Sequence, residues 1–216
     1  MEGMYYPNSG HIETVKEWFN GHEIEVHKIK VDGKNYEACD EASKSWWTKN
    51  KKGGEWNPGL LNSPYDPRKT ERVGILGEMA FGIMTGLPVN LAFKEFGNTT
   101  DFDVLKYTLD VKTAAKNYGA ALVRCVDEYG RLMPLNNDIY SFAYLEFEDR
   151  EAKEAIIAHV GYQTKNVLSS RPIVPARKGS HKNYEIPYHE LKTMSMFMSV
   201  FQKYQCTTYI NHEHKY

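Results

Sequence analysis

The stretch Asp101-Phe-Asp-Val-Leu-Lys-Tyr-Thr-Leu-Asp-Val-Lys112 gives the clearest indication of the fold. It is rich in β-branched and aromatic residues, which predicts two short strands, 102–105 and 107–112. The strands meet at a turn near Leu105 and Lys106. We therefore expect this segment to fold as two adjacent strands.

Three charged side chains of this stretch are expected to converge at a strand end. Alternation along the second strand places Asp110 and Lys112 on one face. Leu109 and Val111 then point into the core. If the turn pairs the two strands, Asp101 at the start of the first lies near Asp110 at the end of the second. The result is two carboxylates and one ammonium in one place.

Such a cluster suits metal-assisted hydrolysis of a phosphodiester. Mg²⁺ prefers carboxylate oxygens and loses its waters reluctantly, so waters and a substrate phosphate complete its shell. A bound metal lowers the pKa of a water and stabilises charge on the phosphate, while a lysine such as Lys112 positions the water. By itself, an Asp-x-Lys pair on a strand is common, and most such pairs are solvated surface pairs.

A third carboxylate comes from the preceding helix. Arg72 to Thr85 carries apolar residues at helical spacing and is followed by glycine and proline stop signals. Glu78 is an acidic residue inside this apolar segment, so it needs a partner. It could project toward the sheet edge and join Asp101 and Asp110.

The rest of the chain predicts a mostly β centre after one helix. Further short strands, bounded by turn residues, are expected at 120–126, 139–147 and 156–161. Residues 184–187 form a short extended piece, and 189–204 form a closing helix. The fold class is therefore α/β, with a central mixed sheet flanked by helices.

The N-terminal part differs in composition. Residues 12–20 predict a short helix, and 24–31 with 35–38 predict a hairpin closed by Asp32-Gly33. A stretch rich in Lys, Gly, Asn and Pro, 48–69, predicts a long loop. These features divide the chain into an N-terminal appendage with a basic loop (1–69), a core (70–205) and a flexible tail (206–216).

The order of these residues resembles the PD-(D/E)XK nuclease superfamily, from about Arg72 to about Met194. The shared pattern is a helical Glu, an Asp that opens a strand, and then Asp-Val-Lys. The resemblance implies a restriction-endonuclease-like core with an N-terminal helix and hairpin added. Later segments also look like the closing strands and helix of small family members: Asp138-Ile-Tyr-Ser-Phe-Ala-Tyr, Val160-Gly-Tyr-Gln-Thr-Lys, Tyr184-Glu-Ile-Pro and His189-Glu-Leu.

The resemblance also implies a Mg²⁺- or Mn²⁺-dependent deoxyribonuclease that hydrolyses phosphodiester bonds with a metal-activated water. Lys112 would orient this nucleophile. The residues expected at the metal are Glu78, Asp101, Asp110 and Val111. The alternatives are an inactive nucleic-acid-binding or scaffold protein with the same fold, and a nuclease subunit active only in a larger assembly. A homodimer is expected because one site cuts one strand, and the small size fits a phage or mobile-element enzyme.

Two departures from the family pattern concern the first aspartate. Asp103 lies on the same strand face as Asp101, so either could be the metal ligand, and the expected distance to Asp110 favours Asp101. The proline that usually precedes this aspartate is absent, with Thr99-Thr100 in its place.

Loop cations could clamp phosphates on either side of the site. The candidates for contact with nucleic acid are Lys51, Lys52, Gln163, Arg177 and Lys178. Solvated loops explain the lysines and the arginine equally well, and an ordinary polar residue at a strand end explains Gln163.

Net charge, cysteine spacing and the length of apolar runs exclude several classes of protein. The 216 residues carry a formal net charge of −1, which excludes a uniformly basic nucleic-acid-coating protein but not a local cationic groove. The three cysteines never form Cys-x-x-Cys, which argues against a disulfide framework and a structural zinc site and favours a cytoplasmic compartment. No apolar run approaches the roughly 20 residues of a membrane helix, so no membrane association is expected.

Overall fold

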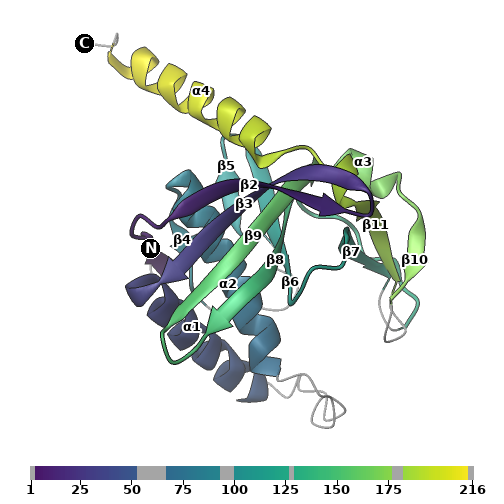
Figure 1. The fold of residues 1–216 in the computed structure, drawn as a ribbon, viewed down its shortest axis with the longest axis horizontal. Helices are drawn as coiled ribbons and strands as arrows, with labels where there is room; N and C mark the ends of the chain where they lie inside the picture. Colours follow the sequence, from purple (N-terminus) through teal and green to yellow (C-terminus); the bar gives the residue numbers. More distant parts are fainter. Residues whose placement is uncertain (1–2, 53–66, 93–99, 127–128, 177–181, 214–216) are drawn as a thin grey trace.

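The central layer of the protein is a six-stranded mixed sheet. The computed structural model describes residues 3–52, 67–92, 100–126, 129–176 and 182–213 (Figure 1). In this sheet β6 and β8 run parallel, and the other neighbouring strands run antiparallel. In spatial order the strands are β2 (Ile12–Phe19), β3 (His22–Asp32), β9 (Glu154–Thr164), β8 (Ile139–Asp149), β6 (Tyr107–Ala114) and β5 (Phe102–Val104).

Two helices, α1 (Gly33–Lys52) and α2 (Pro67–Thr85), cover one face of this sheet and pack against each other (Figure 1). Their buried side chains form the larger apolar core together with Leu109 and Val111 of β6. The first turns of α4 (Met194–Glu213) add to the same core, and the rest of this helix projects from the body. A two-stranded ribbon pairs β1 (Met4–Tyr5) with β4 (Val89–Asn90).

The opposite face carries a second, smaller sheet. Its order is β10 (Ile173–Pro175), β11 (Lys182–Pro187) and β7 (Ala120–Val126). Helix α3 (Lys165–Ser169) and the short 3-10 helix η2 (Tyr188–Glu190) complete this layer. A second apolar cluster, which includes Tyr140, Phe142 and Tyr188, fills the space between the two sheets.

A close contact fixes helix α2 on strand β6. A Cβ added at Gly77 would lie 1.7 Å from Oγ1 of Thr113 and 2.8 Å from its Cβ. Any larger residue would therefore push the helix off the strand, and glycine at this position lets the backbone approach closely. Farther along the same helix, Phe81 packs on Phe102 of β5 with ring centroids 4.8 Å apart. Helix α2 therefore runs along the β5–β6 hairpin.

The N-terminal segment differs from what the sequence predicted. The expected helix over residues 12–20 is wrong, because Ile12–Phe19 forms β2 and pairs with β3. Asn20 and Gly21 close this hairpin with φ angles of 50° and 82°, as in a type I′ turn. The hairpin expected around Asp32-Gly33 is also wrong, since β3 ends at Asp32 and α1 begins at Gly33. Because β3 pairs with β9, this segment belongs to the central sheet.

The later elements agree better with the sequence. The helix expected over 72–85 is confirmed within α2, and the five strands expected after it are confirmed as β5, β6, β7, β8 and β9. The stretch 48–69 is not one loop, because α1 continues to Lys52 and α2 begins at Pro67, while the residues between them lie outside the described ranges. Helix α4 begins later than expected and continues to Glu213, through most of the predicted tail.

A buried ion pair ties helix α2 to the end of β8. Arg72 donates from Nε and Nη2 to the two carboxylate oxygens of Glu148, at 2.7 and 3.1 Å. Tyr36 of α1 donates its hydroxyl to the same carboxylate at 2.8 Å. The Arg72 and Glu148 side chains are only 3% and 10% exposed. Two helices and a strand therefore meet at one hydrogen-bonded charge pair.

Arg72→Ala should lower the free energy of unfolding by about 3–5 kcal/mol, because it leaves the Glu148 carboxylate buried without its countercharge. Urea denaturation measures this loss. The exposed pair of Lys153 and Glu37, 2.6 Å apart, provides the control, and Lys153→Ala should leave the free energy of unfolding nearly unchanged. An equal loss in both variants would contradict the role assigned to Arg72.

An uncharged histidine lies inside the central sheet. His159 of β9 is fully buried, and its Nδ1 is 3.2 Å from Oγ of Ser141 on β8. Burial lowers the pKa of His159 to about 3. The nearby Gly77 backbone opposes this shift, and the neighbouring His27 adds to it. Between this pKa and its ordinary value near 6.5, the histidine takes up a proton only when the chain unfolds.

Acid should therefore destabilise the protein through His159. As the pH falls from about 6.5 toward 3, this residue should lower the free energy of unfolding by about 1.4 kcal/mol per pH unit. Denaturant unfolding at pH 7.5, 6 and 5 should show a shallower pH dependence in His159→Gln than in the wild type. His11→Gln, at an exposed position, is the control. The idea fails if His159→Gln and the wild type share the same slope.

Candidate active site

The β5–β6 hairpin positions the aspartate that opens the first strand. Phe102 pairs with Leu109, and the turn between the strands includes Leu105 at a φ of 60°. The Asp101 backbone N–H donates to the Leu109 carbonyl at 2.9 Å. The Val111 N–H donates to Oδ2 of Asp101 at 2.7 Å. At Asp101 the backbone N–H still bonds to β6, and the side-chain carboxylate takes the place of the next backbone acceptor. The Asp101 carboxylate is therefore held beside the middle of β6.

Asp110 and Lys112 lie next to this carboxylate. Nζ of Lys112 is 2.6 Å from Oδ2 of Asp110, with side-chain exposures of 35% and 4%. Burial raises the pKa of the Asp110 carboxyl to about 7. The Lys112 ammonium opposes this shift, and the nearby Asp101 carboxylate reinforces it. Burial alone would lower the pKa of Lys112, but the attraction of Asp110 and Asp101 leaves it raised. The three residues expected to converge do lie together.

The structure also distinguishes Asp101, which directly precedes β5, from Asp103 within it. Asp101 contacts the Val111 amide, whereas Asp103 is exposed and pairs with Thr108, two residues nearer the hairpin turn than Asp110. Asp101 is therefore the aspartate of this hairpin that contacts the middle of β6.

Tyr140 and Asn137 belong to the same neighbourhood, although the sequence did not indicate them as site residues. Tyr140 is in register with Asp110 across the parallel pair of β6 and β8, and the charge of Asp110 helps to raise its pKa, after the larger effect of burial. The Asn137 N–H donates to the Tyr140 hydroxyl at 3.2 Å. Thr100, next to Asp101, donates its hydroxyl to Oδ1 of Asn137 at 2.7 Å. These bonds fix the start of β8 against the chain that leads into Asp101.

Gln163 lies on the same row of the sheet but farther away. It is in register with Tyr140, which in turn is in register with Asp110. Two strand spacings put its backbone about 10 Å from that of Asp110. Oε1 of Gln163 accepts a hydrogen bond from the Thr164 N–H at 3.0 Å, and Gln163 is 4% exposed. Gln163 is therefore a buried neighbour of Tyr140 rather than a direct neighbour of the two aspartates.

Glu78 comes from the other face of the sheet. It is buried in α2, directly after Gly77, which packs on Thr113. Helix α2 covers the face to which Leu109 and Val111 point, while alternation turns Asp110 to the opposite face. Burial raises the pKa of the Cys39 thiol in α1, and the negative charge of Glu78 adds to this effect. Its carboxylate can therefore approach Asp101 only around the edge of β6.

The oxygen ligands at this edge suit a hard divalent cation. The N–H and C=O of a strand residue point to the same side of the strand, so the Val111 carbonyl faces the edge where Asp101 lies. Two carboxylates and one carbonyl leave positions for water and a phosphate, as Mg²⁺ prefers. A cation would also relieve the repulsion between the two aspartates. Over the described ranges, no three His, Cys, Asp or Glu side chains form a group that could hold a metal.

The basic residues expected to contact nucleic acid cannot be placed with this cluster. The side chains of Lys51 and Lys52 lie outside the description, and so do Arg177 and Lys178 entirely. Their expected contacts with phosphates stay predictions.

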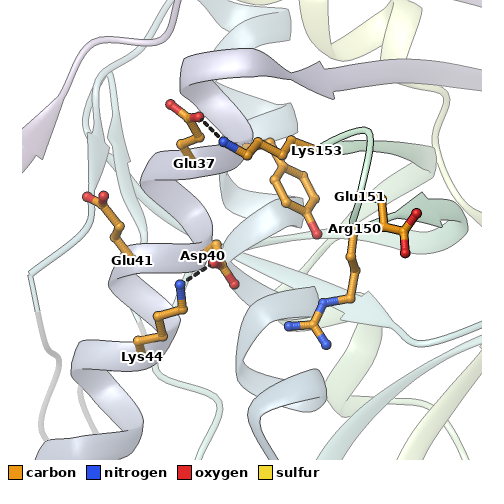
Figure 2. Close-up of a pocket in the computed structure, with 8 residues that line it drawn as sticks. Glu37, Asp40, Glu41, Lys44, Arg150, Glu151 and Lys153 are labelled. Carbon is orange, nitrogen blue, oxygen red and sulfur yellow. Dashed lines mark hydrogen bonds and ion pairs between the residues drawn. The ribbon is translucent and has the colours of Figure 1, made fainter.

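A cavity of about 550 Å³ lies away from Asp101 and Asp110, between α1 and the β8–β9 turn (Figure 2). Its charged groups largely neutralise one another: Lys153 pairs with Glu37, and Lys44 pairs with Asp40, both at 2.6 Å. Tyr140 lies near the start of β8, and the β8–β9 turn follows the end of β8. Roughly 30 Å of extended strand separate Tyr140 from this turn. This cavity is therefore separate from the cluster of Asp101, Asp110 and Lys112.

Comparisons with known proteins add no assignment. No protein family, curated protein or solved structure matches this chain. Among the residues that the structure describes, no helix is long and apolar enough to cross a membrane. The chemical character of the site therefore rests on its own residues.

Divalent metal should stabilise the fold through the two aspartates. Mg²⁺ or Mn²⁺ at ten times its dissociation constant should add about 1.4 kcal/mol to the free energy of unfolding, because it binds the folded state. Thermal unfolding with and without metal measures this as a rise in Tm. Asp110→Asn should abolish the rise, and Asp103→Asn should retain it. A rise that survives Asp110→Asn would place the metal elsewhere.

Proposed function

We propose that this chain is a metal-dependent nuclease of the PD-(D/E)XK superfamily, which hydrolyses phosphodiester bonds in DNA. The observation that carries the proposal is the convergence of Asp101, Asp110 and Lys112 at the edge of a strand. Two carboxylates and an ammonium match the needs of a divalent cation and a phosphate that is being cleaved. The two neighbouring carboxylates would attract such a cation, which would favour their charged forms.

The order of the elements supports a restriction-endonuclease-like core. Helix α2, which carries Glu78, precedes the strand that Asp101 opens, and β6 then carries Asp110 and Lys112. The parallel partner β8 follows after a connection that crosses the sheet. This succession of helix, hairpin and parallel strand agrees with the arrangement that the sequence resemblance implies.

The residues would divide the work as follows. When bound, Mg²⁺ or Mn²⁺ would supply an acidified water and neutralise charge on the phosphate. Asp101, Asp110 and the Val111 carbonyl would bind the cation, with Glu78 reaching it around the edge of β6. Lys112 would then turn from Asp110 to the attacking water and the phosphate oxygens, where its positive charge stabilises the transition state.

Lys112→Ala tests the proposal. Supercoiled plasmid and labelled single-stranded DNA are incubated with wild type and variant, each with Mg²⁺, Mn²⁺ or EDTA. We expect cleavage that requires metal and falls by about 10²–10³-fold in Lys112→Ala, because one electrostatic contact to the transition state is lost. Lys106→Ala, at an exposed position in the turn of the same hairpin, should cleave as the wild type does.

The other results point to different functions. Cleavage that is unaffected by Lys112→Ala would remove this site from the reaction. DNA binding without cleavage under any metal condition would favour an inactive nucleic-acid-binding protein with this fold. Whether both strands of the plasmid are cut together tests the expected homodimer.

A further inference from the structure

A small cavity opens beside Lys112, between the two sheets. Its volume is about 190 Å³, below the roughly 300–1,000 Å³ of pockets for drug-sized ligands. It therefore has room for one flat ring system. Lys112 lines it, together with three aromatic residues, Tyr118, Phe142 and Tyr188.

The residues around this cavity are well packed. Phe142 and Tyr188 are 2% and 3% exposed and belong to the apolar cluster between the sheets. The Tyr188 N–H donates to the Gly119 carbonyl at 3.3 Å, which ties η2 to the segment between β6 and β7. Ala120 and Ala121 also line the cavity, and their short side chains leave the space open. The cavity is thus part of the packed structure.

Tyr118 makes the cavity suitable for an aromatic ligand that carries negative charge. Its side chain is half-buried, and Nζ of Lys116 lies over its ring, 5.4 Å from the centroid. A second ammonium, that of Lys112, also borders the cavity. Aromatic side chains next to cations are the usual platform on which proteins stack bases of single-stranded nucleic acid.

We propose that this cavity receives one unpaired nucleobase of the strand, whose phosphate lies at Asp110 and Lys112. The proposal rests on the proposed nuclease function and specifies its substrate as a strand with an unstacked base near the cleaved bond. Tyr118 stacks on the base, and Lys112 joins the cavity to the catalytic cluster because it borders both. Duplex DNA must then release a base from its stack before that base can enter the cavity.

The test compares a single-stranded oligonucleotide with an abasic strand of equal length, so that the phosphates stay the same. Binding is measured by fluorescence anisotropy in EDTA, where no metal-dependent cleavage occurs. The wild type should bind the strand with bases roughly five- to a hundred-fold more tightly, as expected for one stacked base. Tyr118→Ala should remove most of this difference, and Tyr118→Phe should keep it.

Tyr129→Ala is the matched control. Tyr129 also has a cation over its ring, the Arg131 guanidinium at 5.0 Å, but it is 76% exposed and is not among the residues that line this cavity. Its replacement should leave the preference for bases unchanged. Circular dichroism establishes that each variant is folded.

Two results would overturn the proposal. One is equal affinity of the wild type for the two strands, and the other is a base preference that survives Tyr118→Ala. Either result can occur while metal-dependent cleavage through Lys112 is intact, so failure of the cavity is distinguishable from failure of the nuclease. Conversely, a base preference that depends on Tyr118 in a protein that cleaves nothing would support the cavity and contradict the proposed nuclease.

Discussion

The parallel pairing of β6 with β8 determines how the second sheet and the charged cluster are built. Two parallel neighbours cannot be joined by a tight turn, so the chain between them has to cross the sheet. Here that connection contains β7, which pairs with β11 and builds the second sheet. The same pairing sets Tyr140 beside Asp110 and encloses Phe142 between the layers. The charged cluster and the cavity next to it therefore have one structural origin.

Local signals in the sequence predicted much of this arrangement. The β5–β6 hairpin follows from alternation over a dozen residues, and the contact between Asp101 and β6 follows from the hairpin. Helix α2 was predictable because its apolar face recurs at helical spacing. Glycine is unfavourable inside a helix, yet Gly77 is required by the approach of Thr113. A partner distant in sequence decided that residue, and no local pattern could reveal it.

The parts that sequence analysis missed depend on pairing between distant segments. Ile12–Phe19 became a strand because the Asn20-Gly21 turn pairs it with β3, and β3 in turn with β9. Tyr140 and Asn137 were not indicated as site residues because only the parallel register brings them to Asp110. The expected approach of Glu78 to the sheet edge stays a prediction, because the side of β6 on which α2 packs is a tertiary choice. A helical period alone does not fix that side.

The two edges of the central sheet carry different groups of side chains. β5 and the charged cluster lie at one edge, and β2 lies at the other. Four strand spacings, about 19 Å, separate β2 from β6. Trp18 on β2 is 70% exposed, and neighbouring charges such as Lys16, paired with Glu23 at 2.7 Å, discourage strand addition at this edge. A fluorophore or a surface tether attached at β2 would therefore leave the Asp110 edge accessible to the proposed DNA substrate in single-molecule work.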